Sequence, residues 1–168
     1  MLTRDKLLEM FRKSNALQRG HFELSSGLHS GHYFQCAQVL QYPTQAMAIC
    51  RELARRFRTA KPTVVVGPAA GGIVVSYETA RALGARAIYS ERVDAEMQLR
   101  RGFTVTKKDR VLIVEDAITT GESARKRLRR VTTHRAPTST TTANGPAISR
   151  VRSIAMTRAR GFSRGLDG

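Results

Sequence analysis

The amino-acid sequence predicts an α/β domain built on a largely parallel sheet, because buried strands alternate with helices along the chain. Three short apolar runs have the composition of buried strands: TVVVG at 63–67, ARAIYS at 85–90 and VLIVED at 111–116. A helical pattern separates the first two, and strands joined by a crossover helix lie parallel with a right-handed connection. The 168 residues are enough for one domain with a hydrophobic core.

The first elements precede this pattern. Residues 4–13 are expected to form a helix, because Leu7, Leu8 and Phe11 fall on one face and Thr3 can cap the amino end. The stretch HFELSSGLHSGHYFQC at 21–36 has the pattern of two short extended segments around a Ser/Gly turn.

Two further helices and one more strand complete the expected elements. Pro43 opens a helix whose apolar positions recur at three- to four-residue spacing, at Ala46, Cys50, Leu53 and Phe57. A second helix follows the PAAGG turn and is closed by Gly84. The stretch LRRGFTV at 99–105 is expected to be a strand, joined by a Lys-Lys-Asp turn to the strand at 111–116.

The net charge of +16 is unevenly distributed. Residues 1–123 contain 18 Lys/Arg and 12 Asp/Glu, whereas residues 124–168 contain 11 Lys/Arg and a single acid. A pI of about 11.3 is typical of nucleic-acid binders, but most of the excess charge belongs to the last quarter of the chain. Since residues 132–168 show no helical or strand period, we expect a domain at 1–131 and a basic, disordered tail at 132–168.

The sequence does not indicate a membrane or secreted protein. Its apolar runs are too short to span a bilayer, and the N-terminus carries Asp5 and no apolar core of a secretory signal. Cys36 and Cys50 have no metal-type spacing. We expect both thiols to be reduced, buried and inert in a cytoplasmic protein.

The stretch VLIVEDAITTGES at 111–123 carries the chemistry. In a parallel sheet, ligands bind beyond the carboxyl ends of the strands. Amide and hydroxyl groups of a Thr/Gly turn before a helix can hold a phosphate, while Glu115 and Asp116 suit the hydroxyl groups of a sugar. The stretch therefore predicts a cradle for a ribose 5-phosphate. Taken alone, a strand followed by a capped helix with solvated acids explains it equally well.

A second glycine-rich turn favours the interpretation as a phosphate-binding site. The stretch VVVGPAAGGI at 64–73 also ends a strand in a turn with small residues. Alone it is a weak signal, but a second anion site on a second strand end would suit a diphosphate.

These residues carry a family resemblance. VLIVEDAITTGES resembles the phosphoribosyl diphosphate signature of the type I phosphoribosyltransferases. HFELSSGLHSGHYFQC, VVVGPAAGGIVVSYETARALGARAIYSER and LRRGFTV resemble orotate phosphoribosyltransferases in particular, so that the resemblance covers residues of about 5–123. It implies a Rossmann-like fold with a parallel sheet and a small N-terminal lid. It also implies transfer of phosphoribosyl from phosphoribosyl diphosphate to orotate in pyrimidine synthesis, Mg²⁺ carried by the diphosphate substrate, and a homodimer.

The resemblance also assigns roles to residues. Glu115, Asp116 and Arg92 would be catalytic, with the two acids on the ribose hydroxyls and Arg92 on the diphosphate. Further substrate-binding residues would be Ala117, Ile118, Thr119, Thr120, Gly121, Glu122 and Ser123 around the 5′-phosphate, Ala70 and Gly71 in the pyrophosphate loop, and His29 and Phe34 in the lid over orotate. His29 could equally be an exposed histidine without a role. Arg100 and Arg101 could equally lie on a solvated edge strand.

The sequence departs from the family pattern in two places. Glu122 stands where close relatives have glycine, which puts a carboxylate beside the expected phosphate. Beyond residue 123 we find no match to the family's apolar strand or to its orotate-binding arginine, so we expect the C-terminal strands to be missing. Either a shifted reading frame or a basic arm for nucleic acid explains such a tail. The alternative to a transferase is therefore an inactive scaffold or a basic regulator that binds nucleic acid.

Overall fold

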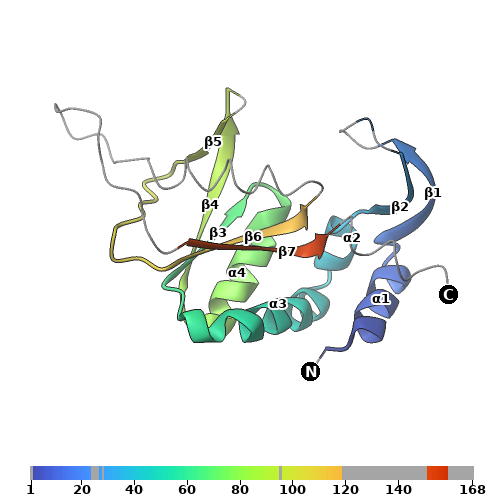
Figure 1. The fold of residues 1–168 in the computed structure, drawn as a ribbon, viewed down its shortest axis with the longest axis horizontal. Coiled ribbons are helices and arrows are strands. Elements are labelled where there is room, and N and C mark those ends of the chain that lie inside the picture. The colour runs from blue at the N-terminus through green and yellow to red at the C-terminus, as the bar shows by residue number, and fades with distance from the viewer. Residues whose placement is uncertain (1, 24–26, 28, 95, 119–150, 159–168) are drawn as a thin grey trace.

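The computed structural model describes residues 2–23, 27, 29–94, 96–118 and 151–158. Its main sheet has the strand order β5-β4-β3-β6-β7 (Figure 1). The strands are β3 (Val64–Pro68), β4 (Arg86–Val93), β5 (Glu96–Leu99), β6 (Val111–Ile118) and β7 (Val151–Arg158). Only β5 runs antiparallel to its neighbour, so the predicted α/β fold with a largely parallel sheet is confirmed.

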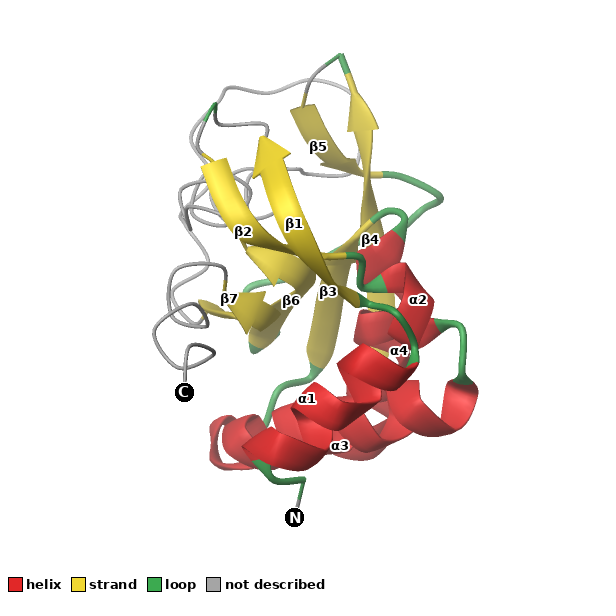
Figure 2. Ribbon diagram, turned by 90° about the vertical axis from the view of Figure 1, so that its right-hand side faces the viewer, coloured by secondary structure: helices red, strands yellow, loops and turns green. Residues whose placement is uncertain are grey.

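The longer helices lie together on one side of this sheet (Figure 2). They are α1 (Arg4–Lys13), α3 (Pro43–Phe57) and α4 (Gly71–Leu83), with the short helix α2 (Ala37–Leu40) and the 3₁₀ turn η1 (Arg58–Ala60). The predicted caps are present, because the Thr3 side chain accepts a hydrogen bond from the Lys6 amide and Gly84 ends α4 with φ +66°. No helix in the described part of the chain is long and apolar enough to cross a membrane.

A separate two-stranded hairpin stands beside α1 and α2 (Figure 1). Its strands are β1 (Leu17–Glu23) and β2 (His29–Phe34), which pair antiparallel from Leu17↔Phe34 to Glu23↔His29. This hairpin confirms the two extended segments predicted around the Ser/Gly turn.

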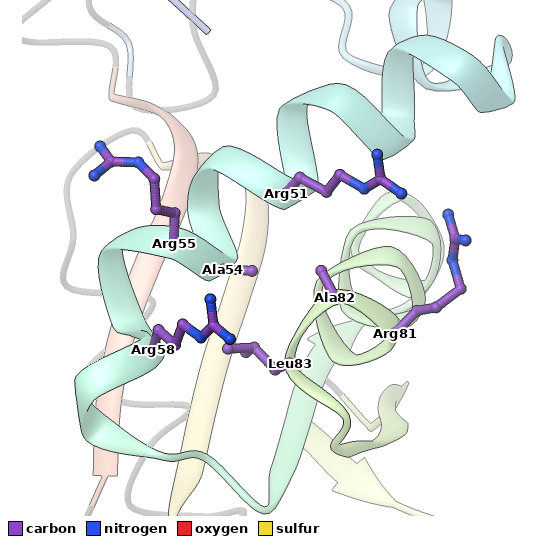
Figure 3. Close-up of a pocket in the computed structure, with 7 residues that line it drawn as sticks. All are labelled: Arg51, Ala54, Arg55, Arg58, Arg81, Ala82 and Leu83. Atoms are coloured by element: carbon purple, nitrogen blue, oxygen red, sulfur yellow. The ribbon is translucent and has the colours of Figure 1, made fainter. Parts of the chain in front are cut away.

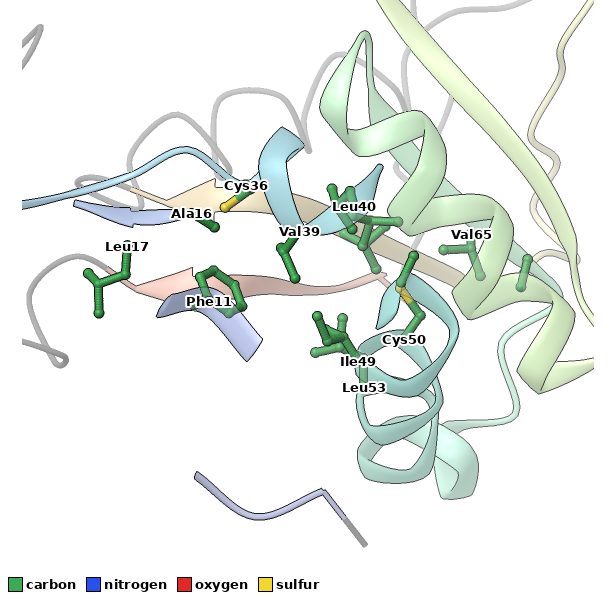
Figure 4. Packing of buried hydrophobic residues seen from close by; sticks show 14 of the residues in the cluster. Phe11, Ala16, Leu17, Cys36, Val39, Leu40, Ile49, Cys50, Leu53 and Val65 are labelled. Atoms are coloured by element: carbon green, nitrogen blue, oxygen red, sulfur yellow. The ribbon is translucent and has the colours of Figure 1, made fainter. Parts of the chain in front are cut away.

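The sheet is buried on both faces. Under the helices, Phe11 of α1, Val39 of α2 and Cys50 of α3 pack with Val65 and Leu112 of the sheet (Figure 4). On the other face, a cluster of buried apolar side chains consists of Val64, Val66, Ile88, Leu99, Val111 and Ile113, with Phe103 and Val105 packed against them. Burial on both faces explains why these strands are continuous apolar runs. The buried positions predicted for Cys36 and Cys50 are confirmed.

The stretch 99–105 is not the strand that the sequence predicts. The strand β5 ends at Leu99, and Arg101 and Gly102 both have positive φ, +58° and +73°. Two left-handed residues in succession end the extended run. The chain then turns so that Phe103 and Val105 cover the second face of the sheet. Before this turn, β4 and β5 pair antiparallel from Ser90↔Leu99 to Val93↔Glu96.

The structure also differs from the expectation that no strand follows β6. Val151–Arg158 forms β7, which pairs parallel with β6 from Val111↔Val151 to Ile118↔Arg158. The exposed edge of a buried strand presents unpaired amide and carbonyl groups, which favour a partner strand. Such pairing uses backbone groups, so a segment without a strong side-chain period can supply it.

Candidate active site

The candidate site lies where β3 and β6 end side by side. The two strands are parallel neighbours, with Val64↔Val111 and Val66↔Ile113 in register. Their carboxyl ends therefore meet at the same edge of the sheet, as the sequence predicts for its two loops. Beyond the paired part, β3 leads into Ala69 and Ala70, and β6 continues through Glu115 and Asp116.

The two acids at the end of β6 face opposite sides of the sheet. Leu112 and Val114 belong to the core under the helices, whereas Val111 and Ile113 belong to the other face. Because side chains alternate along a strand, Asp116 lies on the helix side and Glu115 on the other. Glu115 is only 2% exposed, whereas Asp116 is half-buried.

Asp116 joins the two loops. The carboxylate of Asp116 lies directly against the backbone of Gly71, the first residue of α4, because a Cβ at Gly71 would meet the Asp116 carboxyl carbon at 2.8 Å. One oxygen of this carboxylate also accepts a hydrogen bond from the Ala117 amide at 3.0 Å. The structure thus brings together Asp116 and Gly71, which lie 45 residues apart in the sequence.

The second loop is built tightly. A Cβ at Gly67 would meet the carbonyl carbon of Gly72 at 2.6 Å, so β3 and the start of α4 approach too closely for a side chain there. The Ala69 amide donates to the Ser90 carbonyl at 2.8 Å, which ties the loop to β4, and the Ala69–Ala70 peptide bond is cis. The loop leads directly into the amino end of α4, where backbone amides favour an anion.

Cys36 lies beside the candidate site, a position that the sequence did not predict. Its thiol, 2% exposed, donates to the backbone carbonyl of Asp116 at 3.3 Å. This contact joins the start of α2 to the end of β6. Nothing in the sequence signals it, since the two residues are 80 positions apart.

Arg92 lies at the exposed end of β4. It follows Ser90, the residue that anchors the second loop, by two positions and therefore projects to the same face of the strand. Arg101, by contrast, is held by Glu91 in a bidentate contact of 3.0 and 3.1 Å. The hydrogen bond from Arg101 lowers the pKa of Glu91. This pairing matches the interpretation of Arg101 as a surface residue.

The lid candidates lie on the hairpin. His29 is exposed and its Nδ1 lies 2.8 Å from Nε2 of His21, a cross-strand partner that the sequence reading did not assign. Phe34 packs its ring edge against Phe11, with centroids 5.8 Å apart, and so contributes to the core beside α1. Ala117 and Ile118 are at the end of β6, and Thr119, Thr120, Gly121, Glu122 and Ser123 lie outside the described residues.

Known proteins share this sequence and fold. A family model described as "Phosphoribosyl transferase domain" matches residues 35–143, which extends past residue 123, where we expected the resemblance to end. The orotate phosphoribosyltransferase of Pelotomaculum thermopropionicum is 54% identical over 125 residues, 74% of this chain and 66% of that protein. That of Desulforamulus reducens is 50% identical over 122 residues, 73% of this chain and 64% of that protein.

A solved structure of an orotate phosphoribosyltransferase has a similar fold. The orotate phosphoribosyltransferase of Aeropyrum pernix matches with a TM-score of 0.57 and 26% identity, over 74% of this chain and 72% of that one. The chain spans just under two thirds of the length of the two curated relatives described above.

Proposed function

The chain belongs to the phosphoribosyltransferase family, and on this premise we propose that it transfers the phosphoribosyl group of phosphoribosyl diphosphate to orotate. The products would be orotidine 5′-monophosphate and pyrophosphate. The relatives that share half of its residues over the matched segment bear the name of this activity. The observation that carries the proposal is the contact between Asp116 and Gly71, because it joins a sugar-binding acid to an anion-binding loop.

In this proposal each part of the site holds one part of the substrate. Asp116 accepts hydrogen bonds from the ribose hydroxyls, and the amides at the start of α4 hold the diphosphate. Arg92, at the end of β4, balances charge on the departing pyrophosphate. The reaction centre becomes cationic as the bond to the diphosphate breaks, so the negative charge of Asp116 stabilises the transition state. Catalysis then consists mainly of positioning and electrostatics.

Magnesium enters as part of the substrate. The described residues contain no group of three or more His, Cys, Asp or Glu side chains that could hold a metal ion. Carboxylate oxygens of the kind that Asp116 offers suit Mg²⁺, which is usually bound through one or two carboxylates together with substrate phosphates. The ion would supply neutralisation of the diphosphate charge.

The proposal also covers orotate and a second copy of the chain. His29 and Phe34 of the hairpin would take part in the lid over orotate. We also propose that the enzyme acts as a homodimer. Free, buried Cys36 and Cys50 are compatible with a reducing cytoplasm, where we place the enzyme.

A binder of nucleic acid is the second candidate, favoured by the net charge of +16. The two functions make different predictions. Transfer requires pyrophosphate release that depends on both orotate and phosphoribosyl diphosphate. A nucleic-acid binder would instead show salt-sensitive binding without turnover.

The test compares two substitutions that remove the same charge. Asp116→Asn should abolish orotate-dependent release of pyrophosphate and weaken phosphoribosyl diphosphate binding. Asp5→Asn, in the first turn of α1, removes an equal charge away from the site and should leave both unchanged. Equal behaviour of the two variants would exclude Asp116 from the site.

A further inference from the structure

A basic groove lies between α3 and α4, away from the candidate active site. It is open to solvent and has a volume of about 410 Å³, and arginines of both helices line it together with a small apolar surface (Figure 3). The side chains of Arg51 and Arg81 extend toward the same end of the groove, and Arg58 lies beside Leu83 at the other end. Two helices thus supply cations around a small apolar surface of Ala82 and Leu83, with Ala54 only 4% exposed.

Two of these arginines have no acidic partner within the described residues. Arg55 is paired with Glu52 at 2.8 Å, and Arg81 with Glu78. Arg51 and Arg58 are exposed and enter no ion pair in the part of the chain that the structure describes. The groove therefore carries positive charge that the described side chains leave unbalanced.

Helix dipoles explain only part of this charge. Cations near the carboxyl end of a helix are stabilising, which accounts for Arg55 and Arg81 in the last turns of α3 and α4. Arg51 lies in the middle of α3, and it stands four positions before Arg55, where like charges repel. The helix dipole therefore does not account for the position of Arg51 at the groove.

A second cavity extends the basic surface. It has a volume of about 510 Å³, shares Arg58 and Leu83 with the groove, and adds Lys61 and Arg110. Lys61 lies three residues before the start of β3 and Arg110 directly before that of β6, so both are at the amino ends of these strands. Asp116 lies at the carboxyl ends, so the groove and the candidate active site occupy opposite edges of the sheet.

The lining defines the ligand chemistry. Guanidinium groups bind phosphate through two parallel hydrogen bonds, and the apolar surface suits a base or sugar. A volume of about 410 Å³ is within the range of small-molecule sites. No aromatic side chain lines either cavity in the described part of the chain, so the stacking platform for single-stranded nucleic acid is absent there.

We propose that this groove binds a nucleoside triphosphate, with the phosphates on Arg51, Arg58 and Arg81 and the nucleoside on the apolar surface. The site is independent of the reaction proposed above.

Calorimetry with ATP as the probe tests this. The double substitution Arg51→Ala/Arg58→Ala should weaken ATP binding by about tenfold or more, since it removes two phosphate contacts. Arg56→Ala is the matched control, because Arg56 is exposed on the same helix and paired with Glu52 but does not line the groove. Because Arg51 and Arg58 are both exposed, the double variant should unfold at the same temperature as the unaltered chain. Arg51→Lys/Arg58→Lys keeps the charge, loses the planar fork and should bind with intermediate affinity.

Further ligands separate the sources of affinity. Inorganic tripolyphosphate should bind more weakly than ATP, and adenosine should not bind measurably. The proposal is overturned if the double variant binds ATP as tightly as the unaltered chain, or if Arg56→Ala loses as much affinity. It is also overturned if tripolyphosphate binds as tightly as ATP, or if a single-stranded oligonucleotide displaces ATP at lower concentration.

Discussion

Substitution of Gly71 by alanine would test how the candidate site is assembled. The added methyl group would lie 2.8 Å from the carboxyl carbon and 3.5 Å from Cβ of Asp116. A separation below 3.0 Å cannot persist, so one group must move. The carboxylate is the end of a side chain and can rotate away, whereas Gly71 is fixed in the first turn of α4.

The size of the effect follows from these contacts. Overpacking of this kind costs about 1–3 kcal/mol of folding free energy, which is less than the stability of a typical domain. Displacement of the carboxylate removes a charge-assisted hydrogen bond to the ribose, worth about 1.5–3 kcal/mol. We therefore expect phosphoribosyl diphosphate to bind about ten- to a hundredfold more weakly.

Calorimetry with phosphoribosyl diphosphate, together with thermal unfolding, measures both effects. Gly31→Ala is the matched control, because nothing lies within 4 Å of a Cβ at Gly31. In addition, Gly71→Ala should cost little affinity in a chain that already carries Asp116→Ala, since the clash is then absent. Unchanged affinity of Gly71→Ala, or a loss that adds fully to that of Asp116→Ala, would refute the reasoning.

The remaining predictions concern acid stability, thiol reactivity and the phosphate loop. Arg55, with help from Arg56, holds the pKa of Glu52 at about 2 against an ordinary 4.5, so these ion pairs stabilise the fold above pH 4.5 and their contribution disappears as the pH falls toward 2. In Glu52→Gln, the free energy of unfolding should therefore depend less on pH between 4.5 and 2. The same pH dependence in the variant and the unaltered chain would contradict this. Burial raises the pKa of the Cys50 thiol to about 11, so iodoacetamide at pH 8 should label it only after unfolding, as mass spectrometry can show. Glu122→Gly should tighten phosphoribosyl diphosphate binding at low salt, since a carboxylate beside a phosphate costs about 2–3 kcal/mol at an effective dielectric near 20. If the variant and the unaltered chain bind with equal affinity at both low and high ionic strength, Glu122 does not lie beside the phosphate.

The sequence predicts the helices and the parallel strands well, because their signals are local. Thr3, Pro43 and Gly84 mark helix ends by their own chemistry, and Val64–Val66 form a run that only a strand buried on both faces explains. The meeting of the two loops also follows, since parallel strands end at one edge.

Other features depend on the tertiary structure and leave no local signal. The left-handed backbone at Arg101 ends the expected strand, and Phe103 and Val105 beyond it pack against the second face of the sheet. Alternation predicts that Glu115 and Asp116 point to opposite faces, but which of them lies on the helix side follows only from the packing of β6. The thiol contact of Cys36 with Asp116 arises because α2 packs at the end of β6. The strand β7 pairs through backbone groups, which side-chain patterns do not report.

The release of pyrophosphate from phosphoribosyl diphosphate, with Mg²⁺ and with or without orotate, tests the central claim most directly. We predict release that requires orotate, that yields orotidine 5′-monophosphate in equal amount, and that is lost in Asp116→Asn but retained in Asp5→Asn. If the folded chain releases no pyrophosphate with orotate present, or releases it equally without orotate, the assignment of orotate phosphoribosyl transfer is contradicted.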